Sequence, residues 1–161
     1  MKSLLASLAT LLLLSVPAFA DGKIYVQLPD LSGIKDTEAE SFLSEVVLAN
    51  VISSNCTDFA VRDEEWSLLV DSADILAHEQ LGLGIDDYDT RFYGPAFAAL
   101  DADGACAEHG PEVRNVIDRL VELGGSTEAL PDQDAAYQAE QARQAAWDAA
   151  AAAKPGKTKT K

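Results

Sequence analysis

Histidine and cysteine are scarce in this 161-residue chain, which has two of each. Enzymatic nucleophiles need a neighbouring base and a group that orients the base, and His78 and His109 are the only histidines able to serve as that base. The chain also lacks Gly-x-Ser-x-Gly, His-Glu-x-x-His and phosphate-binding glycine loops. We therefore predict no catalytic residues, and an enzyme of unidentified type ranks third among our functional interpretations.

Metal-binding patterns are equally sparse. Cys106-x-x-His109 supplies two ligands, whereas a structural zinc site needs four. Asp101-x-Asp103, with Glu112 further on, has the acidic spacing of a calcium-binding loop, but Cys106 occupies the position where that loop needs glycine. The sequence therefore predicts no metal site and no cofactor.

Positive charge is also in short supply, with 12 basic against 27 acidic residues. Without residues 1–20 the net charge is −16, because only Lys2 is lost and 11 cations remain against 27 acids. Residues 21–153 hold seven of these cations, so their net charge is −20. This field repels nucleic-acid phosphates and anionic lipid headgroups, so we expect neither partner for the mature protein. A cationic partner, a metal cation or solubility alone would suit the charge.

Only one hydrophobic run is long, and it lies at the N-terminus. Lys2 precedes an apolar segment, Leu4 to Leu14, and the small residues Ala18 and Ala20 follow at the positions that a signal peptidase reads. A membrane-spanning helix needs about 20 apolar residues, so an uncleaved anchor is the less favoured alternative. We predict a signal peptide at 1–20, cleavage between Ala20 and Asp21, and a periplasmic or secreted protein.

Export places the two cysteines in an oxidising compartment, where a single intramolecular pairing is available. The sequence therefore predicts a disulfide between Cys56 and Cys106. Joining positions 50 apart stabilises a fold by about 4 kcal/mol in the chain-entropy model. The chain has no Cys-x-x-Cys, so it lacks the motif of a thioredoxin-like exchange protein.

Four helices are expected between residues 37 and 125. A capping box, Thr37-x-x-Glu40, predicts the start of the first helix, and Asp63 caps a second whose core stripe begins at Trp66. Asp86 or Asp87 caps a third, which Gly94-Pro95 interrupts, and Pro111 opens a fourth that Gly124-Gly125 stops. The first helix has an apolar stripe at helical spacing, formed by Phe42, Leu43, Val46, Val47, Asn50 and Val51.

The predicted fold is all-α: a small bundle of four to five helices closed by one disulfide, with a short extended N-terminal arm. We divide the mature chain into an arm and linker (21–36), the disulfide-closed helical domain (37–125), an alanine-rich C-terminal helix (126–153) and a disordered basic tail (154–161). The C-terminal helix has few large apolar residues, so we expect it to dock by one or two rings or to form on meeting a partner.

Aromatic residues gather in one segment and recur in the C-terminal helix. They supply a candidate binding surface, with core packing as the alternative for the first four. The residues are Tyr88, Phe92, Tyr93, Phe97, Tyr137 and Trp147.

Two resemblances follow from this layout. The order helix, Asn55-Cys56, helix, Leu81-Gly82, aromatic helix, Cys106 looks like small exported two-cysteine helical proteins of bacteria that have no assigned function. The segment Cys56-Thr57-Asp58-Phe59, with a second cysteine some fifty residues later, is similar to the acid-activated periplasmic chaperones, which are small helical proteins with one disulfide.

The leading functional interpretation is an exported, non-enzymatic helical module that binds a protein or peptide partner. The alternative is a periplasmic acid-stress chaperone (holdase), whose many carboxylates would be protonated near pH 3 and expose apolar surface while the disulfide limits unfolding. The sequence identifies neither the partner nor the oligomeric state.

Overall fold

The computed structural model describes residues 22–153, and this part of the chain is all-α, with no β-strand. The predicted signal peptide, with Asp21, and the predicted basic tail lie outside the described residues. The five longer helices are α1 (Asp36–Asn55), α2 (Asp63–Ile75), α4 (Gly94–Leu100), α5 (Ala105–Glu122) and α6 (Gln133–Ala153). The short helix α3 (Ile85–Tyr88) lies between α2 and α4.

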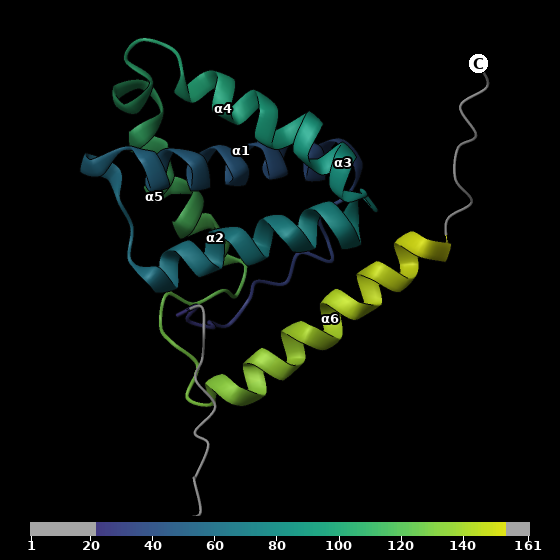
Figure 1. The fold of residues 1–161 in the computed structure, drawn as a ribbon. Helices are drawn as coiled ribbons and strands as arrows, with labels where there is room; N and C mark the ends of the chain where they lie inside the picture. The colour runs from purple at the N-terminus through teal and green to yellow at the C-terminus, as the bar shows by residue number, and fades with distance from the viewer. Residues whose placement is uncertain (1–21, 154–161) are drawn as a thin grey trace, which may run out of the picture.

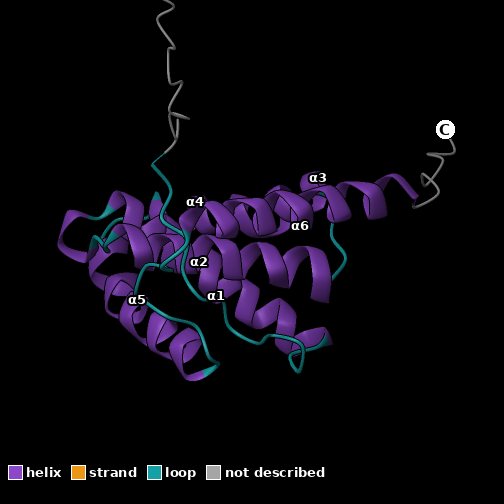
Figure 2. Ribbon diagram, turned by 90° about the horizontal axis from the view of Figure 1, so that it is seen from below, coloured by secondary structure: helices purple, strands orange, loops and turns teal. Residues whose placement is uncertain are grey.

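Helix α1 lies at the centre of the bundle, between α2 on one side and α4 on the other, while α5 crosses behind it (Figure 1). Its stripe of apolar residues predicts this position, because an amphipathic helix buries the face that carries them. Every residue of that predicted stripe is buried, including the polar Asn50. The arm runs beneath α2, and α6 lies beyond the arm at the edge of the molecule (Figures 1 and 2).

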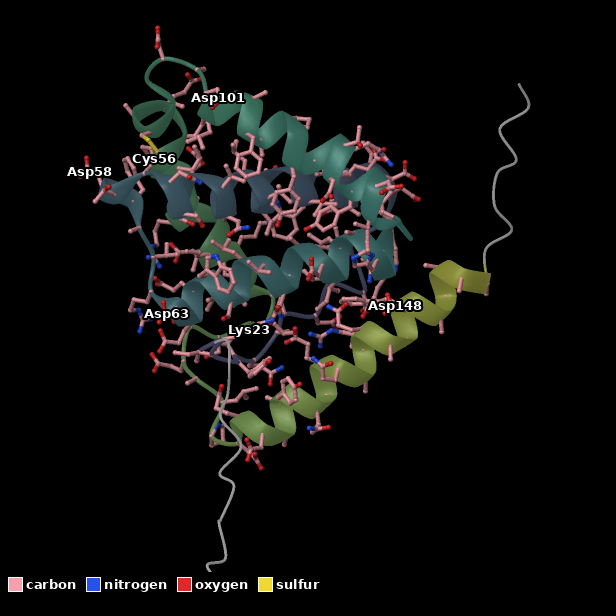
Figure 3. All side chains as sticks on the ribbon, viewed as in Figure 1. Lys23, Cys56, Asp58, Asp63, Asp101 and Asp148 are labelled. Atoms are coloured by element: carbon pink, nitrogen blue, oxygen red, sulfur yellow. A yellow bond between two sulfur atoms is a disulfide. The ribbon has the colours of Figure 1, made fainter. Side chains whose placement is uncertain are left out.

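The predicted disulfide is confirmed. Cys56 follows the last residue of α1 directly, and Cys106 lies in the first turn of α5, with the two Cα atoms 5.6 Å apart (Figure 3). The bond therefore joins two helices that also pack against each other.

The predicted helix caps are displaced. Lys35 is the N-cap two residues before Thr37, and Arg62 is the N-cap one residue before Asp63. The short α3 begins after Gly84, so neither Asp86 nor Asp87 is its N-cap. Helix α1 begins at Asp36, so Thr37 lies inside the first turn and its hydroxyl makes no capping hydrogen bond. Helix α2 begins at Asp63, and the Arg62 backbone N–H donates to the Glu65 carboxylate at 3.1 Å. Trp66 is 38 % exposed instead of leading the core stripe, because Leu68 and Leu69 face the core.

The prediction that Pro111 opens a helix is wrong. Helix α5 starts six residues earlier, after Gly104 in the left-handed region (φ 83°), and Pro111 lies in its interior. The preceding residue, Gly110, lets the helix approach the short 3₁₀ turn Thr57–Phe59, since a Cβ there would lie 2.2 Å from the Phe59 ring. Tertiary packing beside the disulfide therefore outweighs the local preference for proline at a helix start.

Gly110→Ala should destabilise the protein by about 1–3 kcal/mol, because the added methyl overlaps the Phe59 ring and forces a shift in a packed region. The measurement is the urea midpoint of unfolding. Gly33→Ala is the matched control, because a Cβ at Gly33 meets no atom within 4 Å. Equal midpoints for the two variants would contradict the packing argument.

Two π-helical segments interrupt the regular helices. Leu76–Gln80 continues α2, and Asp89–Tyr93 connects α3 to α4. The second segment lies where Gly94-Pro95 predicts a break, because the wider π turn accommodates a proline that has no N–H to donate. Such segments are frequent at functional sites, and both lie next to the aromatic residues predicted as a binding surface.

Candidate functional site

The predicted aromatic surface divides into two parts. Tyr88 and Phe92 are buried, Tyr93 is half-buried and Phe97 is 48 % exposed, so the first segment contributes mostly to the core. The α6 rings lie elsewhere: Tyr137 contacts Tyr25 of the arm, with the ring centroids 6.3 Å apart. His78 connects the two parts, packing 5.7 Å from Tyr88 and 4.9 Å from Trp147.

A polar group lies inside the bundle beside these rings. The Asn50 side-chain amide donates to the Tyr93 hydroxyl at 3.3 Å, whereas Asn50 Oδ1 and Tyr88 Oη are buried without a hydrogen-bond partner among the described residues. Burial raises the pKa of Tyr88. Burial, together with the nearby Asp71 carboxylate, raises the pKa of Asp74 to about 6. Because the pKa of Asp74 is raised on folding, the stability of the fold depends on pH.

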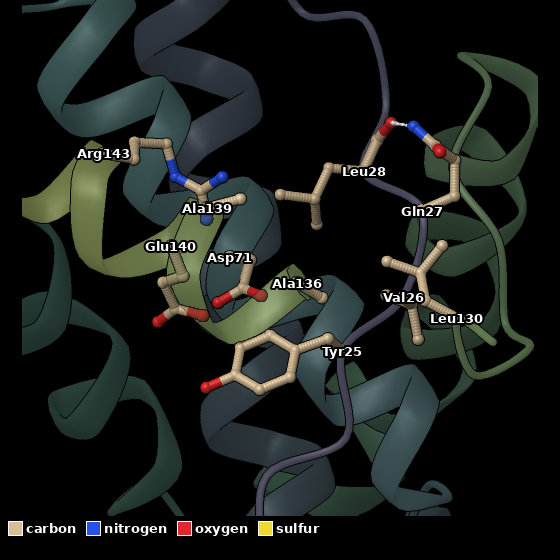
Figure 4. Close-up of a pocket in the computed structure, with 10 residues that line it drawn as sticks. All are labelled: Tyr25, Val26, Gln27, Leu28, Asp71, Leu130, Ala136, Ala139, Glu140 and Arg143. Carbon is tan, nitrogen blue, oxygen red and sulfur yellow. Dashed lines mark hydrogen bonds between the residues drawn. The ribbon is translucent and has the colours of Figure 1, made fainter. Parts of the chain in front are cut away.

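A cavity lies between the arm, α2 and α6 (Figure 4). Its volume is about 230 Å³. Its apolar walls come from the arm, the loop before α6 and α6 itself, and its charged groups come from α2 and α6. The lining residues are Tyr25, Val26, Gln27, Leu28, Asp71, Leu130, Ala136, Ala139, Glu140 and Arg143.

One edge of the extended arm is paired. The Tyr25 carbonyl accepts from the Leu130 N–H at 2.8 Å, and the Gln27 carbonyl accepts from the Ser126 N–H at 2.9 Å. The Gln133 side-chain amide adds two bonds to the Tyr25 backbone. These contacts explain why the arm, which forms one isolated bridge from Val26 to Ala129, keeps a fixed position.

The other edge of the arm is unpaired at Val26. In an extended chain the N–H and C=O of successive residues point to alternate edges, so those of Val26 point away from the loop that Tyr25 and Gln27 bind. Neither Val26 group has a hydrogen-bond partner among residues 22–153, although Val26 is 3 % exposed. Four consecutive arm residues line the cavity, and side chains alternate between faces, so part of this wall is backbone.

Lys23 connects the arm to both helices. Its Nζ lies 2.6 Å from an Asp71 oxygen on α2 and 2.8 Å from a Glu140 oxygen on α6. Burial opposes the charge on Lys23, but the two carboxylates more than compensate and its pKa is raised. Burial raises the pKa of Asp71, and the hydrogen bond from Lys23 limits this effect. The ion pairs therefore hold one wall of the cavity together.

Lys23→Met should destabilise the fold by about 2 kcal/mol, because Asp71, whose side chain is 4 % exposed, loses its cation. It should also free α6 from the arm, making α6 the first site of cleavage in limited proteolysis. Lys35→Met is the matched control, since the Lys35 amine bonds only to Gln80 on the surface. An unchanged cleavage pattern in Lys23→Met would contradict the assigned role.

Arg143 lines the cavity and forms no ion pair with a carboxylate of residues 22–153. Its guanidinium carbon lies 5.4 Å from the Trp147 ring centroid, one turn further along α6. Its Nε is buried and has no hydrogen-bond partner in the described chain. Figure 4 shows the side chain reaching from α6 toward Leu28 and Asp71. The cavity thus combines a guanidinium that forms no ion pair, a backbone edge with unpaired N–H and C=O groups, and apolar walls.

Sequence reasoning named Tyr137 and Trp147 as candidate binding residues, but neither lines the cavity, which the sequence did not predict. Val26 carries no signal of its role, because which edge of the arm is unpaired depends on its pairing with the loop. Arg143 does carry one, since it is the only cation in the alanine-rich segment 126–153. Within residues 22–153, no group of three or more His, Cys, Asp or Glu side chains could hold a metal ion.

None of the helices in residues 22–153 has the length and the hydropathy needed to cross a membrane. Comparison with known proteins gives no relative, since no family model, no curated protein and no solved structure matches this chain.

Proposed function

We propose that this protein is an exported, non-enzymatic module that binds a protein or peptide segment in the cavity between the arm, α2 and α6. The observation that carries the proposal is the unpaired edge of Val26, whose N–H and C=O have no hydrogen-bond partner among residues 22–153. An extended segment laid beside the arm would satisfy both groups, as in recognition by strand addition. Without such a partner, the two groups are buried at a cost in stability.

Two features of the described residues are compatible with the exported location that the proposal includes. The Cys56–Cys106 disulfide and the absence of a spanning helix in residues 22–153 are compatible with an exported protein that is not anchored by that region. We therefore place the binding event in the periplasm or outside the cell, after cleavage between Ala20 and Asp21.

A cavity-filling variant tests the proposal. Ala139→Trp places an indole against the cavity wall, whereas Ala145→Trp places one on the opposite, exposed side of the same helix. In pull-downs from periplasmic extract, the mature wild-type protein and Ala145→Trp should capture the same partner, and Ala139→Trp should lose it. No capture above background, or equal capture by Ala139→Trp, would refute binding at this cavity.

An acid-stress chaperone is the second proposal, and the acidic composition favours it. Burial alone would raise the pKa of Glu65, but hydrogen bonds from Arg114 and the Arg62 backbone lower it overall, so acid weakens this ion pair. The mature protein should then bind ANS and suppress client aggregation at pH 3. Absence of both activities would exclude the chaperone role.

A further inference from the structure

We propose that the segment bound in the cavity is the C-terminal end of a polypeptide, with its terminal carboxylate on the Arg143 guanidinium and its last, apolar side chain against the cavity walls. This inference rests on the proposed function and specifies its ligand class.

The partners of the other cations identify Arg143 as the anion-binding group. In residues 22–153, every lysine and arginine other than Arg143 has a hydrogen bond or ion pair to a side chain. Arg143 has neither, although the body of the protein is strongly acidic. The two carboxylates nearest to it in the cavity, Asp71 and Glu140, are both bonded to Lys23. Arg143 acts on Asp71 only without direct contact, so an anion from outside the chain could bind its guanidinium directly.

The guanidinium is also prepared for such a ligand. Contact with the Trp147 ring limits the freedom of the Arg143 side chain, and its Nε is buried, so the terminal nitrogens of the guanidinium are the ones left to bind a ligand. A guanidinium offers parallel N–H donors that match the two oxygens of a carboxylate. Arginine held in this way binds a carboxylate with a defined orientation.

The backbone edge indicates that the carboxylate belongs to a chain end. Pairing with the N–H and C=O of Val26 requires a ligand with its own peptide N–H and C=O, which a free small acid lacks. The cavity volume is about 230 Å³, so the cavity suits one residue better than a long segment.

The walls define the preferred last residue. Tyr25, Leu28 and Leu130 contribute apolar surface, while Ala136 and Ala139 leave room for a side chain. Arg143 offsets the charge of the terminal carboxylate, whereas a second negative charge on the last side chain would be repelled by Asp71 and Glu140. We therefore expect leucine, valine or a similar apolar residue at the ligand C-terminus.

Calorimetry with two peptides tests the proposal. The probes are N-acetyl-Ala-Ala-Val-Leu with a free C-terminal acid and the same peptide as its C-terminal amide, each titrated into the mature protein at pH 7 in 0.1 M salt. The acid should bind at least tenfold more tightly than the amide. Arg143→Gln should weaken the acid at least tenfold and leave the amide unchanged. Arg91→Gln, which removes a surface ion pair with Glu40, is the control and should bind as the wild type does.

Each result has a distinct meaning. If acid and amide bind equally, or if Arg143→Gln binds the acid as tightly as the wild type, recognition of a C-terminal carboxylate is wrong, while the proposed binding function stands. If neither peptide binds, recognition of an apolar chain end is also refuted, and the Ala139→Trp pull-down decides the proposed function separately. Circular dichroism of Arg143→Gln checks that α6 remains helical.

Discussion

A Cys56→Ala, Cys106→Ala double variant should have a free energy of unfolding about 4 kcal/mol lower than that of the wild type. The disulfide closes a loop over a sequence separation of 50, and its loss restores the entropy of that loop to the unfolded chain. Such a loss is a large share of the net stability of a domain of this size. The measurement is urea unfolding followed by circular dichroism.

Alanine is preferred to serine here because Cys56 is 3 % exposed and a buried hydroxyl would add its own cost. Wild-type protein treated with a reductant is the matched comparison and should unfold at a similar urea concentration. A difference below 1 kcal/mol between oxidised protein and the double variant would show that packing of α1 against α5 restrains the chain without the disulfide.

Asp74→Asn should stabilise the protein by about 3 kcal/mol at pH 7.5 and by only about 1 kcal/mol at pH 4.5. The pKa of Asp74 is about 6, above its ordinary value of 3.8, because burial and the neighbouring Asp71 disfavour its charge. Each pKa unit corresponds to about 1.4 kcal/mol, so ionised Asp74 weakens the fold at neutral pH. His78 and Lys23 offset part of this cost, whereas Glu140 adds to it.

The direction of the pH effect follows from these shifts. A carboxyl whose pKa is raised on folding adds stability as pH falls through about 6, and Asp71 acts in the same direction. Glu65, whose pKa is lowered, removes stability at pH values below its ordinary 4.5. We therefore expect the wild-type melting temperature to rise from pH 7.5 to about pH 5 and to fall below pH 4.5.

A control variant accompanies this prediction, and two outcomes would contradict it. Glu79→Gln, which changes an exposed carboxyl one turn further along the same helical segment, should leave the pH profile unchanged. A wild-type melting temperature that falls steadily from pH 7.5 to pH 5 would show that Asp74 is not protonated near pH 6. Equal profiles for Asp74→Asn and the wild type would assign the effect to other carboxyls.

The sequence predicts the disulfide and most of the helices because their signals are local or limited in number. Two cysteines leave one pairing, and the stripe of α1 specifies its buried face. Helix starts are less well predicted, because Pro111 and Thr37 each fit a start that tertiary packing moves to another residue. The π segments have no sequence pattern of their own beyond Gly94-Pro95.

The candidate site could not be predicted in the same way, because it depends on contacts between distant residues. Lys23 and Glu140 are 117 residues apart, and Tyr25 and Gln133 are 108 apart. The unpaired edge of Val26 exists only because the loop before α6 occupies the opposite edge. A pattern within a single segment cannot report such an arrangement.

The peripheral position of α6 has a consequence for how the molecule opens. No residue of α6 is buried, whereas α1 is packed on several sides, so the two helices differ in local stability. In hydrogen–deuterium exchange, amides of α6 should exchange through a small local opening, and those of α1 only through global unfolding. A ligand in the cavity would slow exchange in α6 and at the Val26 amide, so these amides report occupancy without any change in the disulfide-closed body.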